Sequence, residues 1–316
     1  MIRRADFFLK SYSCTEAISV SIEDLEIHIE QDPKNSILVE KLLREINVAS
    51  ETGILTLKGP NSKDAFREIA IEIRHLLCLA LGKRIIFDRQ KYWHDEHHEL
   101  VTMPMPKNQN KGNQIIPDTE LGLYIATTLP IWLKFHKTKK DHFFTMIDYL
   151  NQTKHDFIED RVLRTVQAWE CAANFWMPEV SLPEQLVELR SRIKTTIKNW
   201  KSENQYNDVD GEVASRILSA IDRQTLMIKL GNLLDIHKLK AGSLNLDLKY
   251  LKKLRDQVAH SGRIDIAGDA ADKLLKPGIT GLQLILLKEV GYKGKVNGEQ
   301  NGWKAIRSIQ QYFEED

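Results

Sequence analysis

The chain has few cysteines, and those that it has lie far apart: Cys14, Cys78 and Cys171. An odd number of scattered cysteines provides neither a disulfide framework nor a thiolate zinc site. The sequence also lacks a run of about 20 apolar residues, which a membrane-spanning helix needs. Its first residues lack the apolar stretch of a secretory signal. These absences lead us to expect a cytoplasmic protein that has no membrane partner.

The chain has almost no net charge, with a formal value of +1 at pH 7. No field from the whole protein would therefore draw it to nucleic acid, and any attraction for RNA must come from a local patch. Its glycines are dispersed at expected turns and helix ends, so no glycine-rich phosphate loop is visible. A serine-nucleophile elbow and a kinase-like set of motifs are missing as well.

What the sequence does contain is an ordinary globular composition, with 42% hydrophobic and 28% charged residues. Its 316 residues are enough for two domains. The periodicity predicts an α+β protein. Residues 1–117 are expected to form a mixed α/β domain that ends in a loop-rich linker at about 92–117. Residues 118–316 are expected to form an all-α bundle.

Strands and helices alternate in the predicted N-terminal domain. Period-two alternation of apolar and polar residues is typical of half-buried strands. This alternation predicts strands at Ile18–Ile22 and Leu25–Glu30. Two shorter apolar runs predict further strands at Ile54–Leu57 and Arg84–Phe87. Helical spacing predicts helices at Ile37–Ile46 and Ala65–Leu81. Ser62 is a suitable N-cap for the second of these helices, and Gly82 a suitable C-cap.

The C-terminal part shows helical spacing almost throughout. Proline and capping residues divide it into five helices. They are expected at about 158–176, from Pro183 to about Lys201, from Asp210 to near Gly242, from Leu244 to beyond Val258, and at 267–290 with a kink at Pro277.

One short motif in the fourth of these helices indicates a chemistry. Arg255 and His260 form an Arg-x4-His pattern with a polar residue, Asp256, directly after the arginine, and Ser261-Gly262 follows as a turn. This resembles the signature of HEPN domains, small helical bundles found in many ribonucleases. In that family an Arg-polar-x3-His sequence spans the end of the penultimate core helix and the following loop.

The resemblance extends beyond the motif. Arg164–Trp176 looks like the opening helix of such domains, and Leu284–Gly294 resembles the closing segment of the anti-phage ApeA-like group. Over residues 155–295 it implies a metal-independent endoribonuclease without a cofactor, which acts as a homodimer on RNA. Members of these groups are defence effectors or toxins, so the N-terminal domain would be a sensor or specificity module. Whether a neutralising or activating partner exists is left open.

The residue types suit this reaction. RNA cleavage without a metal requires a proton to leave the 2′-hydroxyl and another to reach the departing 5′-oxygen, and histidine performs such transfers near neutral pH. The guanidinium of Arg255 would stabilise the phosphorane, because its donors match two phosphate oxygens. Asp256 would orient Arg255 or His260.

The spacing adds a constraint. Residues five apart on a straight helix are separated by about 140°, so Arg255 and His260 do not converge unless the turn at Ser261-Gly262 folds His260 back or a second copy completes the groove. Arg255 also lies on the apolar stripe of its helix and therefore needs a partner. Glu170 on the opening helix is one candidate, since some members of the family have an acidic residue there.

Other interpretations compete at each position. Arg255 could make an interhelical ion pair with Asp160 or Glu170 and His260 could cap the helix, which would leave a dimerising or RNA-binding scaffold without catalysis. The segment His94–His98 could bind a metal, although a solvated polar loop explains it better. A basic helical stretch beside Trp200 could follow an RNA backbone or could be a solvated face. Its residues are Arg190, Arg192, Lys194, Lys198 and Lys201.

Overall fold

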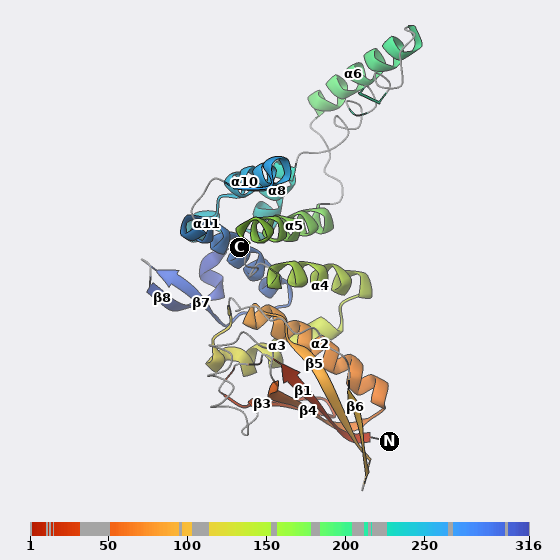
Figure 1. The fold of residues 1–316 in the computed structure, drawn as a ribbon, viewed down its shortest axis with the longest axis vertical. Coiled ribbons are helices and arrows are strands. Elements are labelled where there is room, and N and C mark those ends of the chain that lie inside the picture. The colour runs from red at the N-terminus through yellow and green to blue at the C-terminus, as the bar shows by residue number, and fades with distance from the viewer. Residues whose placement is uncertain are drawn as a thin grey trace.

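The computed structural model confirms an α+β fold in which an antiparallel sheet is followed by helices (Figure 1). It describes residues 2–10, 12, 14, 16–31, 51–94, 97–102, 114–152, 157–177, 184–203, 212–213, 216, 226–264, 268–300 and 303–315. The predicted helix Ile37–Ile46 lies outside these residues. None of the helices described combines the length and the hydropathy that crossing a membrane would require.

The sheet has six strands in the order β2-β3-β4-β1-β5-β6, and each neighbouring pair is antiparallel. The strands are β1 (Ile2–Lys10), β2 (Ile18–Ile22), β3 (Leu25–Gln31), β4 (Glu51–Asn61), β5 (Ile86–His94) and β6 (His97–Thr102). The predicted strands correspond to β2, β3, the middle of β4 and the start of β5.

Strand β1, which is not predicted from the sequence, lies near the middle of the sheet between β4 and β5. Its Phe7 and Leu9 are fully buried on one face of the sheet, and the carboxylate of Asp6 is buried on the other. Asp6 accepts hydrogen bonds from the Thr56 hydroxyl at 2.9 Å and from the Trp93 indole at 2.7 Å. These bonds satisfy a buried charge in the sheet.

The prediction of a loop from residue 92 to 117 is wrong for its first part. Strand β5 continues to His94, and β6 returns antiparallel to it, with Arg89 opposite Thr102 and His94 opposite His97. β6 is an edge strand whose side chains are almost all exposed. It therefore lacks the apolar alternation by which a half-buried strand is found in a sequence.

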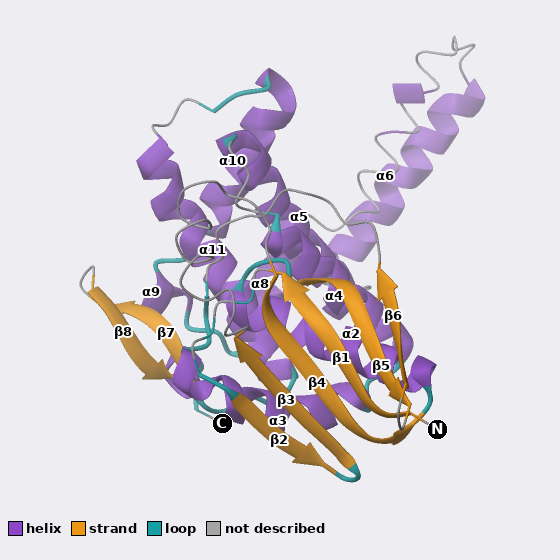
Figure 2. Ribbon diagram, turned by 60° about the horizontal axis from the view of Figure 1, so that its bottom comes forward, coloured by secondary structure: helices purple, strands orange, loops and turns teal. Residues whose placement is uncertain are grey.

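Two helices connect the sheet to the helical part. Helix α2 (Lys63–Leu81) packs against β1 and β4, and its ends are capped as predicted, by Ser62 and by Gly82 at a φ of 58°. Helix α3 (Leu121–Leu133) packs against β2 and α2. Both helices lie on the same side of the sheet (Figure 2).

A helical layer continues away from α2 and α3 (Figure 1). Helix α4 (Lys137–Asn151) packs on α5 (Ile158–Trp176), and α5 contacts α8 (Leu226–His237), α10 (Leu248–Ser261) and α11 (Gly268–Glu289). The buried side chains form one cluster from the sheet to these helices. The division into domains at residue 117 stays a prediction.

The third predicted helix ends earlier than expected. Its proposed cap Asp210 lies outside the described residues, and α8 ends at His237 instead of near Gly242. Lys238 has a left-handed backbone with a φ of 54°. Leu239 then pairs with Phe313 in an antiparallel bridge. After the short helix α9 (Ala241–Leu244), the chain enters α10.

A hairpin near the C-terminus is also not predicted from the sequence. Strands β7 (Lys295–Gln300) and β8 (Trp303–Ser308) pair antiparallel and form a sheet of their own, and a short helical turn, η2 (Ile309–Tyr312), follows them. The amide of Asn297 donates to the carbonyl of Ile115 at 2.7 Å, which joins the hairpin to the segment before α3. This part of the chain is therefore not all-α.

Helix α11 continues across Pro277, where a kink was expected, and meets α5 and α10 at Gly278. The carbonyl of Gly278 accepts a hydrogen bond from the Trp169 indole at 3.0 Å. A Cβ atom added at Gly278 would lie 2.7 Å from Cδ1 of Leu251 and 3.3 Å from Cγ2 of Thr165. Only glycine lets the three helices approach so closely.

We therefore expect Gly278→Ala to lower the free energy of unfolding by about 1–3 kcal/mol, because the buried Leu251 and its neighbours must move to admit the methyl group. Urea denaturation followed by circular dichroism measures this change. Gly231→Ala in α8 is the matched control, since a Cβ there meets no atom within 4 Å. It should be neutral or stabilising by up to about 1 kcal/mol. Equal effects of the two substitutions would contradict the close approach at Gly278.

Candidate functional site

The motif residues lie on α10, an amphipathic helix with capped ends. The Asp247 side chain accepts a hydrogen bond from the amide of Tyr250 at 2.9 Å, and Gly262 ends the helix with a φ of 73°. One face of the helix is buried against the helical layer, through Leu248, Leu251, Leu254 and Val258. The opposite face carries the polar residues to the surface.

Arg255 lies at the border between these two faces and is held by two carboxylates. Its Nη2 donates to Oε1 of Glu170 on α5 at 3.1 Å, and its Nη1 donates to Oδ1 of Asp256 at 3.1 Å. The prediction that Glu170 leans toward the motif helix is confirmed. The arginine side chain is 39% exposed, so its guanidinium remains within reach of solvent.

Asp256 links Arg255 to a second cation. Its Oδ2 accepts a hydrogen bond from Lys252 Nζ at 2.5 Å, one helical turn earlier. The hydrogen bond from Lys252 and then the one from Arg255 lower the pKa of the Asp256 carboxyl, and these effects exceed the opposing effect of burial. Asp256 is therefore a carboxylate near neutral pH and can only accept hydrogen bonds. Its position suits the orientation of Arg255.

His260 lies in the last turn of α10 and is exposed. The helix continues through Ser261, so the turn at Gly262 comes too late to fold His260 back toward Arg255. The two residues thus have the separation of about 140° that a regular helix gives them. The turn therefore cannot bring Arg255 and His260 of one chain together. The other arrangement expected from the sequence, a second copy that completes the groove, remains.

An open groove of about 460 Å³ follows the outer face of α10. His260 and Asp256 line it, and three lysines spaced at helical intervals join them: Lys249, Lys252 and Lys253. These lysines are not among the residues predicted from the sequence. The available signal was their helical spacing: Lys249 precedes Lys252 by three residues, and Lys252 precedes Asp256 by four. This spacing places them on the solvent side of the apolar stripe.

The basic stretch predicted to bind substrate lies on another helix, α6 (Glu184–Glu203). Helix α6 extends away from α5, α10 and α11 in both views (Figures 1 and 2). Within one chain the structure therefore does not bring Arg190, Lys194 and Lys198 next to the motif helix. Arg192 forms an ion pair with Glu188, one turn earlier on α6.

The histidine-rich segment forms part of the β5–β6 hairpin. His94 of β5 lies opposite His97 of β6, and His98 contacts the Trp93 ring at a centroid distance of 5.2 Å. Among the residues that the structure describes, no three or more His, Cys, Asp or Glu side chains are grouped so that they could hold a metal ion. Asp95 and Glu96 lie outside these residues.

Comparison with known proteins gives no relative for this chain. No protein-family model matches it, and neither a curated protein nor a solved structure is significantly similar to it. The resemblance to HEPN domains therefore rests on the motif and its setting, and stays a prediction.

Proposed function

We propose that this chain is a metal-independent endoribonuclease of the HEPN type that cuts RNA as a homodimer, in defence or as a toxin. One observation carries the proposal. The exposed His260 lines a lysine-rich groove on α10, and Arg255 lies on the same helix, one turn earlier. Proton transfer and anion stabilisation are the two tasks of the reaction, and these two side chains supply them.

The reaction needs two convergent sets of groups. One His260 takes the proton of the 2′-hydroxyl as its oxygen attacks phosphorus. The other copy's histidine gives a proton to the 5′-oxygen as the P–O5′ bond breaks. The products are a 2′,3′-cyclic phosphate and a free 5′-hydroxyl, so atoms and charge balance without a metal or a cofactor.

The remaining polar groups have supporting tasks. Arg255 stabilises the phosphorane, and Asp256 holds the guanidinium while this charge develops. Lys249, Lys252 and Lys253 neutralise neighbouring phosphates. Such contacts weaken as the salt concentration rises, because the release of counterions from RNA then contributes less to the free energy of binding. Arg255 and His260 of one chain point in different directions. In a dimer that joins the two α10 grooves, Arg255 of one copy can converge with His260 of the other.

The full-length protein is tested by incubation with tRNA and mRNA in excess EDTA. We expect endonucleolytic products that carry 2′,3′-cyclic phosphate ends, because no step requires a divalent ion. Analysis of the product termini by mass spectrometry distinguishes these ends from the 3′-hydroxyl or 5′-phosphate ends typical of metal-dependent cleavage. Cleavage that appears only with Mg²⁺ or Mn²⁺, or no cleavage by the dimer, would contradict the proposal.

A second candidate function is supported by the ion pair between Arg255 and Glu170. An arginine whose two terminal nitrogens both contact carboxylates could serve only to join α10 to α5. The chain would then be a dimerising scaffold that binds RNA on the lysine groove. RNA that is bound and remains intact would favour this scaffold, with an affinity that falls after replacement of Lys253 and does not change after replacement of His260.

A further inference from the structure

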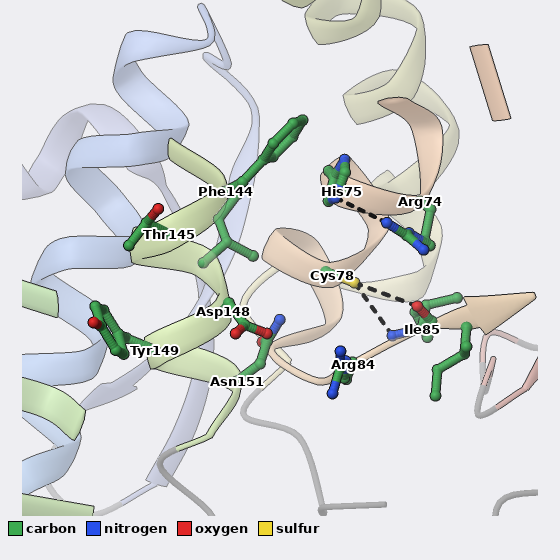
Figure 3. A pocket seen from close by; sticks show the side chains of 12 residues that line it. Arg74, His75, Cys78, Arg84, Ile85, Phe144, Thr145, Asp148, Tyr149 and Asn151 are labelled. Atoms are coloured by element: carbon green, nitrogen blue, oxygen red, sulfur yellow. Dashed lines mark hydrogen bonds between the residues drawn. The ribbon is translucent and has the colours of Figure 1, made fainter. Parts of the chain in front are cut away.

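A half-enclosed cavity of about 480 Å³ lies between the sheet part and the helical layer, far along the chain from the α10 groove. Helix α2 forms one wall, α4 forms the other, and the segment leading into β5 closes its base (Figure 3). The volume falls within the range of roughly 300–1,000 Å³ that is usual for small-molecule sites.

Two guanidinium groups make this cavity suited to an anion. Arg74 of α2 and Arg84 before β5 both line it. Among the described residues, neither of them forms an ion pair with a carboxylate. Burial, and then the charge of Arg84, lowers the pKa of Arg74, and the opposing attraction of Asp148 does not offset these effects. An anionic ligand would relieve that cost, and the fork of an arginine fits two oxygens of a phosphate.

His75 also lines the cavity, next to Arg74. Arg74 Nη2 donates to His75 Nε2 at 3.0 Å. Since arginine can only donate, this bond makes Nε2 the acceptor and leaves the imidazole proton on Nδ1. Burial, and then the charges of Arg74 and Lys140, lowers the pKa of His75 to about 3, so the ring is neutral. Nδ1 is buried and has no hydrogen-bond partner among the described residues.

The remaining lining groups suit the rest of a nucleotide. The Phe144 ring of α4 stacks on the His75 ring at a centroid distance of 3.5 Å and presents an aromatic surface at the wall. Asp148 and the amide of Asn151 extend from α4 toward the cavity opposite Arg74 (Figure 3). Asp148 accepts a hydrogen bond from Gln152 at 2.6 Å and retains its second oxygen as an acceptor for a sugar hydroxyl or a base amine.

We propose that this cavity between α2 and α4 binds a 5′-mononucleotide, with its phosphate on Arg74 and Arg84 and its base and sugar against Phe144, Asp148 and Asn151. The site goes beyond the proposed ribonuclease function and does not depend on it. The single carboxylate leaves the cavity with a net positive charge, since His75 is neutral. This balance favours a ligand that has one phosphate group over an uncharged nucleoside.

Isothermal titration calorimetry of the full-length protein tests this site with the four 5′-mononucleotides, adenosine and inorganic phosphate. At least one mononucleotide should bind with one site per chain, and at least about tenfold more tightly than adenosine or phosphate alone. Arg84→Gln should weaken its binding at least about tenfold, because charge-assisted hydrogen bonds are lost. Arg84 is exposed, so this substitution should leave the fold intact, as circular dichroism can verify.

Two matched variants separate this site from the rest of the surface. Arg192→Gln on α6 removes an exposed arginine elsewhere, and His260→Ala alters the α10 groove. Both should bind the mononucleotide as tightly as the wild type. The proposal is overturned if no mononucleotide binds, or if Arg84→Gln binds as well as wild type. It is also overturned if His260→Ala abolishes binding, because the ligand would then occupy the α10 groove.

Discussion

Replacement of His260 by alanine is expected to lower the rate of RNA cleavage by about 10²–10⁴-fold, the usual contribution of a positioned general acid or base. The imidazole is exposed on the last turn of α10, so its loss removes a proton-transfer group without opening a cavity in the core. Dimerisation and the unfolding midpoint should therefore remain close to those of the wild type. Single-turnover cleavage of a labelled RNA measures the rate.

The control for this prediction is His97→Ala, which removes an exposed histidine from the sheet edge. It should leave the cleavage rate within about twofold of the wild type, because it touches nothing on α10. A mixed dimer sharpens the test. If a His260→Ala subunit is combined with a wild-type subunit, the composite groove keeps one of its two histidines, and the rate should lie between those of the wild type and the His260→Ala homodimer. Retention of most activity in His260→Ala alone would refute the catalytic role.

Replacement of Trp132 by alanine is expected to cost about 3–5 kcal/mol of stability, which is a large part of the total of about 5–15 kcal/mol typical of a folded domain. The indole is fully buried on α3 and contacts three phenylalanine rings, those of Phe135, Phe143 and Phe144. Its Nε1 donates to Glu72 on α2 at 2.7 Å, and Lys140 on α4 donates to the same carboxylate at 2.8 Å. The substitution therefore removes both packing and the link among three helices.

Urea unfolding of Trp132→Ala and Trp132→Phe separates these two contributions. The phenylalanine variant keeps most of the packing and loses only the donor to Glu72, so it should fold and lie between the alanine variant and the wild type. Trp200→Ala is the matched control, because that indole on α6 is 44% exposed. Its effect should stay below about 1 kcal/mol. A loss at Trp132 no larger than that at Trp200 would contradict the central place of this cluster.

Local signals predicted the parts of the fold that depend on local interactions. The caps of α2 were readable because Ser62 satisfies an amide three residues away and Gly82 adopts a conformation that other residues avoid. Strand β1 was not readable in the same way. Ala5, Asp6 and Phe7 are buried in succession, so both faces of the strand are covered there, and such strands lose the simple alternation of polar and apolar residues.

The candidate site was predictable only in part. The motif identified Arg255 and His260, and an acidic partner on α5 was foreseen in Glu170. The lysines of the groove did not stand out in the sequence, because the basic run of α6 is longer, although it belongs to a helix that extends away from α10. The cavity that contains Arg74 and Arg84 could not be foreseen, since its walls come from segments far apart in the sequence. Only tertiary packing brings such groups together.

The bridge between Leu239 and Phe313 fastens the chain's last residues to the connection between α8 and α9. The Lys240 amide also donates to the Tyr312 carbonyl at 2.8 Å, and the Glu314 amide donates to the Lys238 carbonyl at 2.8 Å. All of α10 and α11 lies within the loop that these contacts close. If α10 alone separated from the helical layer, the connections at both ends of this loop would be strained. We therefore expect α10 and α11, with Arg255 and His260, to open together as one cooperative unit.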